Sequence, residues 1–118
     1  MATPEGKIKG LVKAALKLIK RIYWFMPVAG TYGRAGIPDF ILCVPTKITP
    51  DMVGRTIGAF VAIETKAEDG TYGLTKLQAY NLELISDAGG VGYVVDSKAK
   101  FEQVLLDLKQ HGAVLELK

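Results

Sequence analysis

Three polar side chains interrupt apolar stretches of the sequence in an arrangement that could do chemistry. Asp39 stands at the start of the apolar run 39–44, and Glu64 and Lys66 stand at the end of another, 59–66. Residues two apart on a strand project to the same face, so the Glu64 carboxylate and the Lys66 ammonium are expected side by side. A Glu-x-Lys triplet alone usually belongs to a solvated strand end. Asp39 alone could be a turn residue.

Taken together, the two motifs predict a site for a divalent cation. Carboxylates on neighbouring strands can hold Mg²⁺ or Mn²⁺, hard cations that bind oxygen ligands. Without a cation, two carboxylates ~4 Å apart repel by about 4 kcal/mol at an effective dielectric constant of about 20. A bound cation removes this repulsion, activates water and neutralises charge on a phosphate under attack. Lys66 would orient the water or stabilise the transition state. The indicated chemistry is metal-dependent phosphodiester hydrolysis.

The elements that must position these side chains indicate an α/β chain. A first helix is expected to begin at Thr3-Pro4-Glu5, with a capping hydroxyl and a proline in its first turn. A second would run from the capping box Thr75-Lys-Leu-Gln78 to Gly89, and a third from Ser97 to about Gln110. Strands are expected at 22–28, 37–44, 59–66, 91–95 and 113–117.

Apolar residues at helical spacing give the predicted core. The inward residues of the three helices are expected to be Ile8, Leu11, Val12, Ala15, Leu16, Ile19 and Ile22; Leu77, Tyr80 and Leu84; and Phe101, Val104, Leu105 and Leu108. The sole cysteine, Cys43, is expected to be a small core residue. The sole histidine, His111, stands where a helix cap or an exposed position is expected.

Composition narrows the class of protein. The chain has 118 residues, 49% hydrophobic and 23% charged, which is typical of a single globular domain covering 1–118. One cysteine and one histidine exclude disulfide frameworks, thiolate metal sites and Ser-His-Asp triads. The net charge of +3 permits a nucleic-acid partner without requiring one. Lysines interrupt every early apolar stretch, so we expect no signal peptide, no membrane span and a soluble, intracellular (cytoplasmic) protein.

Several of these segments resemble the motifs of a nuclease family. Gly36-Ile-Pro-Asp39, Ala62-Ile-Glu-Thr-Lys66 and Leu77-Gln-Ala-Tyr80 followed by Gly89-Gly90 resemble those of the VRR-NUC family, the virus-type replication–repair branch of the PD-(D/E)xK nucleases. The resemblance runs from about Glu5 to Val95. It implies a restriction-endonuclease-like mixed β-sheet flanked by helices, Mg²⁺- or Mn²⁺-dependent cleavage of DNA, and a phage or bacterial origin. Segment 46–58 is longer than the connection usual in that family.

The resemblance also implies roles for individual residues. Asp39 and Glu64 would be metal ligands, Thr65 would lend its backbone carbonyl to the metal, and Lys66 would be the catalytic lysine. Gln78 and Glu5 would join the site. Both have simpler explanations, because Glu5 also favours a helix N-terminus and Gln78 also completes a capping box.

Basic and aromatic residues around these motifs are candidates for DNA contact. Lysines on one face of the first helix are usually solvated surface, but they could also contact phosphates. Tyrosines in loops beside the site could stack on bases. The candidates are Lys9, Lys13, Lys17, Tyr32, Arg34, Tyr72 and Lys76.

The expected function is a stand-alone DNA endonuclease without a nucleotide cofactor. Single-domain members of the resembled family tend to be homodimers that cut branched DNA such as four-way junctions, and a two-fold dimer could cut two strands at once. Two alternatives remain open. One is a non-catalytic DNA-binding or assembly subunit with the same fold, and the other is a restriction-type enzyme that reads a specific site.

Overall fold

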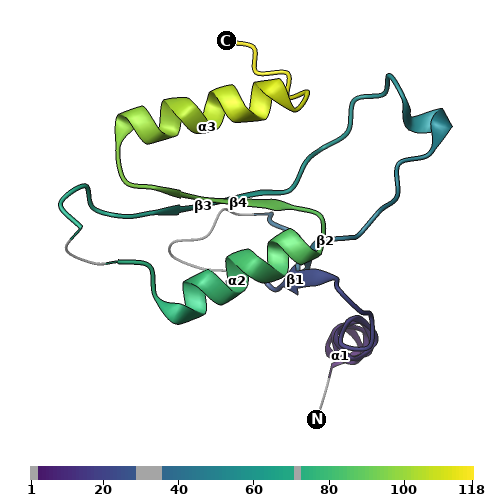
Figure 1. The fold of residues 1–118 in the computed structure, drawn as a ribbon. Coiled ribbons are helices and arrows are strands. Elements are labelled where there is room, and N and C mark those ends of the chain that lie inside the picture. Colours follow the sequence, from purple (N-terminus) through teal and green to yellow (C-terminus); the bar gives the residue numbers. More distant parts are fainter. Residues whose placement is uncertain (1–2, 29–35, 71–72) are drawn as a thin grey trace.

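The computed structural model describes residues 3–28, 36–70 and 73–118. Its elements are α1 (Pro4–Leu16), β1 (Tyr23–Phe25), β2 (Ile41–Cys43), the short 3₁₀ helix η1 (Pro50–Met52), β3 (Val61–Thr65), α2 (Lys76–Asp87), β4 (Val91–Val95) and α3 (Lys98–Gln110) (Figure 1). The described chain is therefore mixed α/β, as the sequence predicts.

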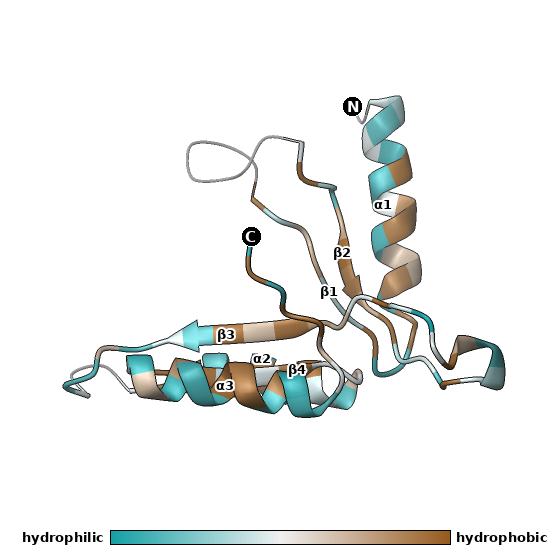
Figure 2. Cartoon of the chain, turned by 90° about the horizontal axis from the view of Figure 1, so that it is seen from above, coloured by the Kyte–Doolittle hydropathy of each residue, from teal (hydrophilic) through white to brown (hydrophobic). Residues whose placement is uncertain are grey.

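Two separate pairs of strands replace the single sheet expected from the sequence. β1 and β2 form an antiparallel hairpin in which Tyr23 pairs with Cys43. β3 and β4 are parallel, from Val61 opposite Val91 onward, and α2 is the crossover helix that a parallel pair requires. Among the described residues β2 does not pair with β3. The hairpin and α1 instead extend away from the β3–β4 layer (Figure 2).

Side-chain caps define where the helices begin. Thr3 accepts a hydrogen bond from the Gly6 amide at 3.0 Å and starts α1. Ser97 accepts from the Lys100 amide at 3.1 Å and starts α3. Such caps satisfy amides that a helix leaves without partners. α1 ends at Leu16, before Ile19 and Ile22 of its predicted inward face, and the chain then turns toward β1 through Arg21, whose φ is +62°.

The core lies around the β3–β4 layer, which α2 and α3 cover on opposite faces (Figure 1). Leu82 of α2 contacts Gly92, and Tyr93 on the next position of β4 donates its hydroxyl to Asp107 of α3. The buried side chains are Leu16, Cys43, Ile85, Ala88 and Val104. Burial of Leu16, Cys43 and Val104 confirms three of the core predictions.

Other core predictions are wrong. Ile8 and Leu11 are 62% and 67% exposed, because α1 stands away from the β3–β4 layer and only Leu16, at the end of the helix, is buried. Tyr80 is 55% exposed, since α2 turns Ile85 inward rather than the predicted face. Phe101 of α3 is also exposed. The strand predicted at 113–117 is also wrong, since the structure has no strand there.

The chain is more open than a compact domain of its length. Its accessible surface is 9986 Å², whereas a compact monomer of this mass has roughly 6,300 Å². Its radius of gyration is 17.2 Å, against about 13.5 Å for a compact domain. No helix in residues 3–28, 36–70 and 73–118 is long and apolar enough to cross a membrane.

Candidate active site

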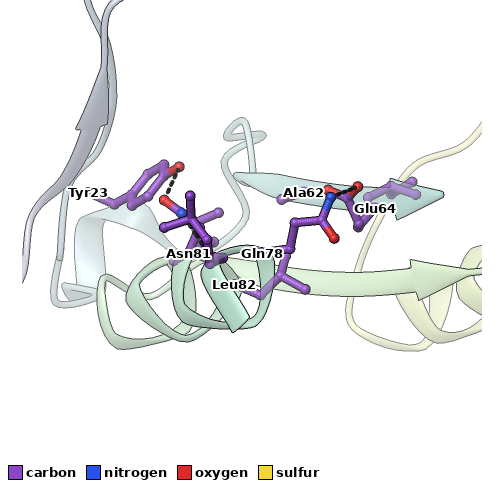
Figure 3. A pocket seen from close by; sticks show the side chains of 9 residues that line it. Tyr23, Ala62, Glu64, Gln78, Asn81 and Leu82 are labelled. Carbon is purple, nitrogen blue, oxygen red and sulfur yellow. Dashed lines mark hydrogen bonds between the residues drawn. The ribbon is translucent and has the colours of Figure 1, made fainter. Parts of the chain in front are cut away.

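Glu64, Lys66 and Gln78 form a connected group where β3 ends and α2 begins. The Gln78 amide donates from Nε2 to Glu64 Oε1 at 2.9 Å, and its Oε1 accepts from Lys66 Nζ at 2.7 Å. Lys66 Nζ also lies 3.8 Å from Glu64 Oε1. Figure 3 shows Gln78 reaching from α2 to the Glu64 carboxylate on β3. The side chains of Lys66 and Glu64 are only 15% and 34% exposed, so water screens this pair less than a surface pair.

Strand geometry explains why Glu64 and Lys66 meet. The Lys66 amide donates to the Val95 carbonyl at 2.9 Å, so strand pairing continues one residue beyond β3. Side chains two apart then share a face, as the sequence predicts. That face is turned to α2, where Gln78 lies.

The start of α2 fixes the Gln78 amide. The Gln78 backbone amide donates to Thr75 Oγ1 at 3.1 Å, and the Thr75 amide donates to Gln78 Oε1 at 3.0 Å. This is the predicted capping box. Gln78 Oε1 therefore accepts from the Thr75 amide and from the Lys66 ammonium together. Gln78 thus completes the cap of α2 and contacts Glu64 and Lys66 at the same time.

Asp39 and Glu5 form a second group, joined by Lys9. Lys9 Nζ lies 3.8 Å from Asp39 Oδ1 and 3.9 Å from Glu5 Oε1. The structure thus links the acid in the first turn of α1 to Asp39 through one lysine, although the two acids stand 34 positions apart in the sequence (39 − 5). Asp39 is 57% exposed and Glu5 78%, so these ion pairs are weak. Lys9, expected on a DNA-facing stripe, here neutralises carboxylates.

The structure does not bring the two groups into one cluster. Among the described residues no three His, Cys, Asp or Glu side chains gather as metal ligands. Asp39 pairs with Lys9, whereas Glu64 pairs with Gln78 and Lys66. Carboxylate oxygens and the nearby backbone carbonyl of Thr65 are donors of the type that Mg²⁺ and Mn²⁺ prefer. These oxygen donors therefore fit such a cation in chemical type, but the structure places Asp39 and Glu64 in two separate groups.

A groove of about 300 Å³ runs beside Glu64, between β3, α2 and the start of β1. Tyr23 closes the end opposite Glu64 and donates its hydroxyl to Asn81 Oδ1 at 3.4 Å (Figure 3). The remaining walls are mostly apolar and include Ala62, Leu77 and Ile85. Sequence reasoning missed Tyr23 and Asn81. The spacing of Asn81 from Gln78, one helical turn, was the available signal.

The remaining DNA-contact candidates divide into two sets. Lys13 on α1, Lys17 at its C-terminal cap and Lys76 at the start of α2 are exposed, so they are accessible to a phosphate backbone. Tyr32, Arg34 and Tyr72 lie outside the described residues.

No family model matches this chain, and neither a curated protein nor a solved structure is significantly similar to it.

Proposed function

We propose that this chain is a Mg²⁺- or Mn²⁺-dependent DNA endonuclease of the PD-(D/E)xK type, with a restriction-endonuclease-like domain similar to the VRR-NUC family. The observation that carries the proposal is the group of Glu64, Gln78 and Lys66. A carboxylate and an ammonium are held half-buried at the end of one strand, bridged by an amide that a helix cap orients. A solvated strand end needs no such bridge, so the group supports a chemical role.

The residues predicted for the site would each have a role in phosphodiester hydrolysis. Asp39 and Glu64 would hold the cation, with the Thr65 backbone carbonyl as a further ligand. The cation, when bound, supplies an activated water and neutralises phosphate charge. Lys66 would place its ammonium beside the carboxylate, where it can hold a water or stabilise negative charge in the transition state. Gln78 fixes the Lys66 ammonium and the Glu64 carboxylate relative to each other. Glu5, linked to Asp39 through Lys9, would help to orient Asp39.

The proposed substrate is branched DNA, such as a four-way junction, cut by a homodimer. Exposed Lys13, Lys17 and Lys76 suit contacts to phosphates, which carry no sequence information. Selectivity would then come from the shape of the DNA. Two symmetric sites in a dimer match two strands of a junction.

Cleavage of labelled linear, flapped and four-way DNA, with and without Mn²⁺, tests the proposal. We expect metal-dependent incision of the junction by the wild-type chain and by Glu68→Gln, a control on an exposed residue just after β3. Glu64→Gln should abolish incision. Incision that continues in excess EDTA, or in Glu64→Gln, contradicts the proposal.

One observation favours a second candidate, a DNA-binding subunit that does not cut. Asp39 lies in a different group from Glu64, and an enzyme of this type needs both in one site. Junction binding by the wild-type chain, without incision under any Mg²⁺ or Mn²⁺ condition, would support this candidate.

A further inference from the structure

The groove between β3 and α2 extends well beyond its charged end at Glu64. Along β3 the lining runs back from Glu64 to Ala62, about 7 Å of strand. Along α2 it continues to Ile85, over about two turns or roughly 10 Å of helix. Tyr23 and Asn81 lie toward the other end (Figure 3). The proposed metal chemistry uses only the charged end, so the rest of the groove needs an explanation of its own.

The walls between the two ends are mostly apolar, and the space they enclose is small. Ala62, Leu77 and Ile85 line the groove, whose volume is about 300 Å³. This volume is at the lower limit of ligand pockets, so the groove fits one small group rather than a large molecule. At ~30 Å³ for each water, about ten waters would fill it, and most of them would face apolar atoms. Displacement of such poorly held waters by an apolar surface favours binding.

Tyr23 and Asn81 leave hydrogen-bonding capacity at the far end of the groove. The Tyr23 hydroxyl donates to Asn81 Oδ1 at 3.4 Å, which is longer than the ~2.7 Å usual for a hydroxyl donor. Asn81 Nδ2 donates to the Leu77 carbonyl at 2.9 Å, which uses one of its two N–H groups. Within the described chain Asn81 thus keeps one N–H group beside an oxygen that is only weakly bonded. A ligand for this end should present an acceptor next to a donor.

A nucleobase meets these requirements together. It is a flat ring system with apolar faces, and its Watson–Crick edge places a donor beside an acceptor. Proteins hold a base that has left the stack by packing side chains on its faces and forming hydrogen bonds to this edge. An aliphatic protein side chain would fill the same space but would leave the Asn81 amide without a partner. All four bases have such an edge, so the contact would tolerate any sequence.

The charged end of the groove suits the backbone of the same DNA strand. Lys66 lies beside Glu64 and is 15% exposed, and Lys76 is exposed at the start of α2. A phosphate held at this end, as the proposed function requires, would bring a neighbouring base to the mouth of the groove. Entry of that base then depends on whether it can leave the stack.

We infer that the groove holds one nucleobase of the bound DNA, taken out of the stack beside the strand at Glu64. Extraction of a base costs free energy, and it costs least where pairing is already disturbed, as at a branch point. The groove thereby supplies a selectivity for branched DNA that contacts to phosphates do not give. The inference rests on the DNA binding of the proposed function, but not on cleavage.

The fluorescence of 2-aminopurine tests the inference in the full chain, because this base emits strongly only outside the stack. It replaces one base at a time around the centre of a four-way junction, in EDTA, so that the metal-dependent reaction does not occur. We expect the wild-type chain to increase the emission at one position for each site. Asn81→Leu, which removes the amide, and Ala62→Leu, which fills the groove, should lose the increase. Ser86→Leu, a matched control at an exposed position of α2, should keep it.

Binding affinity gives a second readout from the same variants, whose fold circular dichroism checks. The wild-type chain should prefer the junction to a linear duplex of the same length by roughly 10–100-fold. Asn81→Leu should reduce this preference roughly tenfold, because the extracted base loses its hydrogen bonds. Its affinity for the linear duplex should not change, since the bases there stay stacked. A merely structural role of Asn81 would lower both affinities together and so contradict the inference.

Other outcomes of the fluorescence experiment also overturn the inference. An increase that persists in both groove variants would place the unstacking elsewhere on the DNA. No increase at any position would mean that no base enters, whether the groove stays open or an apolar protein segment fills it. A chain that binds no DNA would defeat the inference and the proposed function together. Base capture by a chain that cuts no junction with Mn²⁺ would uphold the inference and defeat the proposed endonuclease.

Discussion

Glu64 and Lys66 lie within 3.8 Å of each other, yet each makes its shortest contact with the amide of Gln78. The charges are thus joined through a neutral group as well as directly. The same amide accepts a hydrogen bond from the Thr75 backbone, so the start of α2 fixes which side of Gln78 meets the lysine. The helix cap and the orientation of the charged pair are consequently set by one side chain.

Substitution of Gln78 can separate these two roles. Gln78→Glu keeps an acceptor for the capping box but replaces the amide donor with a carboxylate beside Glu64. We expect unchanged thermal stability and a loss of cleavage of about 10²-fold, comparable to the removal of one oriented donor. Gln78→Ala should lose the same activity and also about 1 kcal/mol of stability, because the Thr75 amide loses its side-chain acceptor. Full activity in Gln78→Glu, measured by single-turnover cleavage, would show that the amide only caps the helix.

Asp39, Glu64 and Lys66 should behave as one unit. Lys66→Ala should reduce the rate of cleavage roughly 10²–10³-fold. Combining it with Asp39→Ala should cost much less than the product of the two single effects. Single-turnover rates on a labelled junction measure these losses, and circular dichroism checks the fold. Independent, multiplicative effects would argue that the residues do not share a site.

Lys13 and Lys17 should contribute to DNA binding if they contact phosphates. Lys13→Gln with Lys17→Gln should reduce the salt slope of DNA binding by about 2, because each phosphate contact contributes ~0.9. The control, Lys109→Gln with Lys118→Gln, removes the same charge from α3 and the C-terminal segment. Equal slopes in the two double variants would assign the α1 lysines to plain solvated surface.

Lys9 should differ from its neighbours on α1, because it pairs with Asp39 and Glu5. If Lys9 neutralises Asp39 in the absence of a cation, Lys9→Gln leaves that carboxylate available. We expect Lys9→Gln to lower the Mn²⁺ concentration needed for half-maximal cleavage, whereas Lys13→Gln leaves it unchanged. A higher requirement for Mn²⁺ in Lys9→Gln would contradict this role.

Gly90 should tolerate a side chain less well than Gly92. A Cβ on Gly90 would lie 2.8 Å from Ile85 Cγ2 and 3.1 Å from the Phe60 backbone oxygen, which cannot move freely. A Cβ on Gly92 meets Leu82 Cδ2 at 2.7 Å, the end of a flexible side chain. Gly90→Ala should destabilise by about 1–3 kcal/mol, and Gly92→Ala by less. Urea unfolding measures both, and the opposite order would contradict the close packing of Gly90 against Ile85 and the Phe60 carbonyl.

The sequence predicted correctly those helix and strand boundaries that a neighbouring glycine or capping residue marks. β4 is found at the predicted Val91–Val95, and α3 ends at the predicted Gln110, because a side-chain cap and a turn glycine mark these boundaries. The shared face of Glu64 and Lys66 follows from strand alternation alone. The bridge through Gln78 could not be predicted, since it depends on how α2 packs on β3.

Tertiary placement is where the sequence-based predictions were wrong. The spacing of Ile8 and Leu11 shows that α1 has an apolar face, but spacing does not show whether another element covers it. The contact of Lys9 with Asp39 joins α1 to the segment before β2, and no local pattern encodes it. The single mixed sheet was expected from the family resemblance, whereas the described strands form two pairs.

The division of the β3–β4 layer into two faces has a practical consequence. Glu64, Lys66 and the groove all belong to the face covered by α2. α3 packs on the other face, where Tyr93 donates to Asp107. A fluorophore or a surface tether attached to the exposed side of α3, for instance at Lys109, would leave the α2 face accessible. Binding of a labelled four-way junction, the proposed substrate, could then be followed on single molecules without blocking that face.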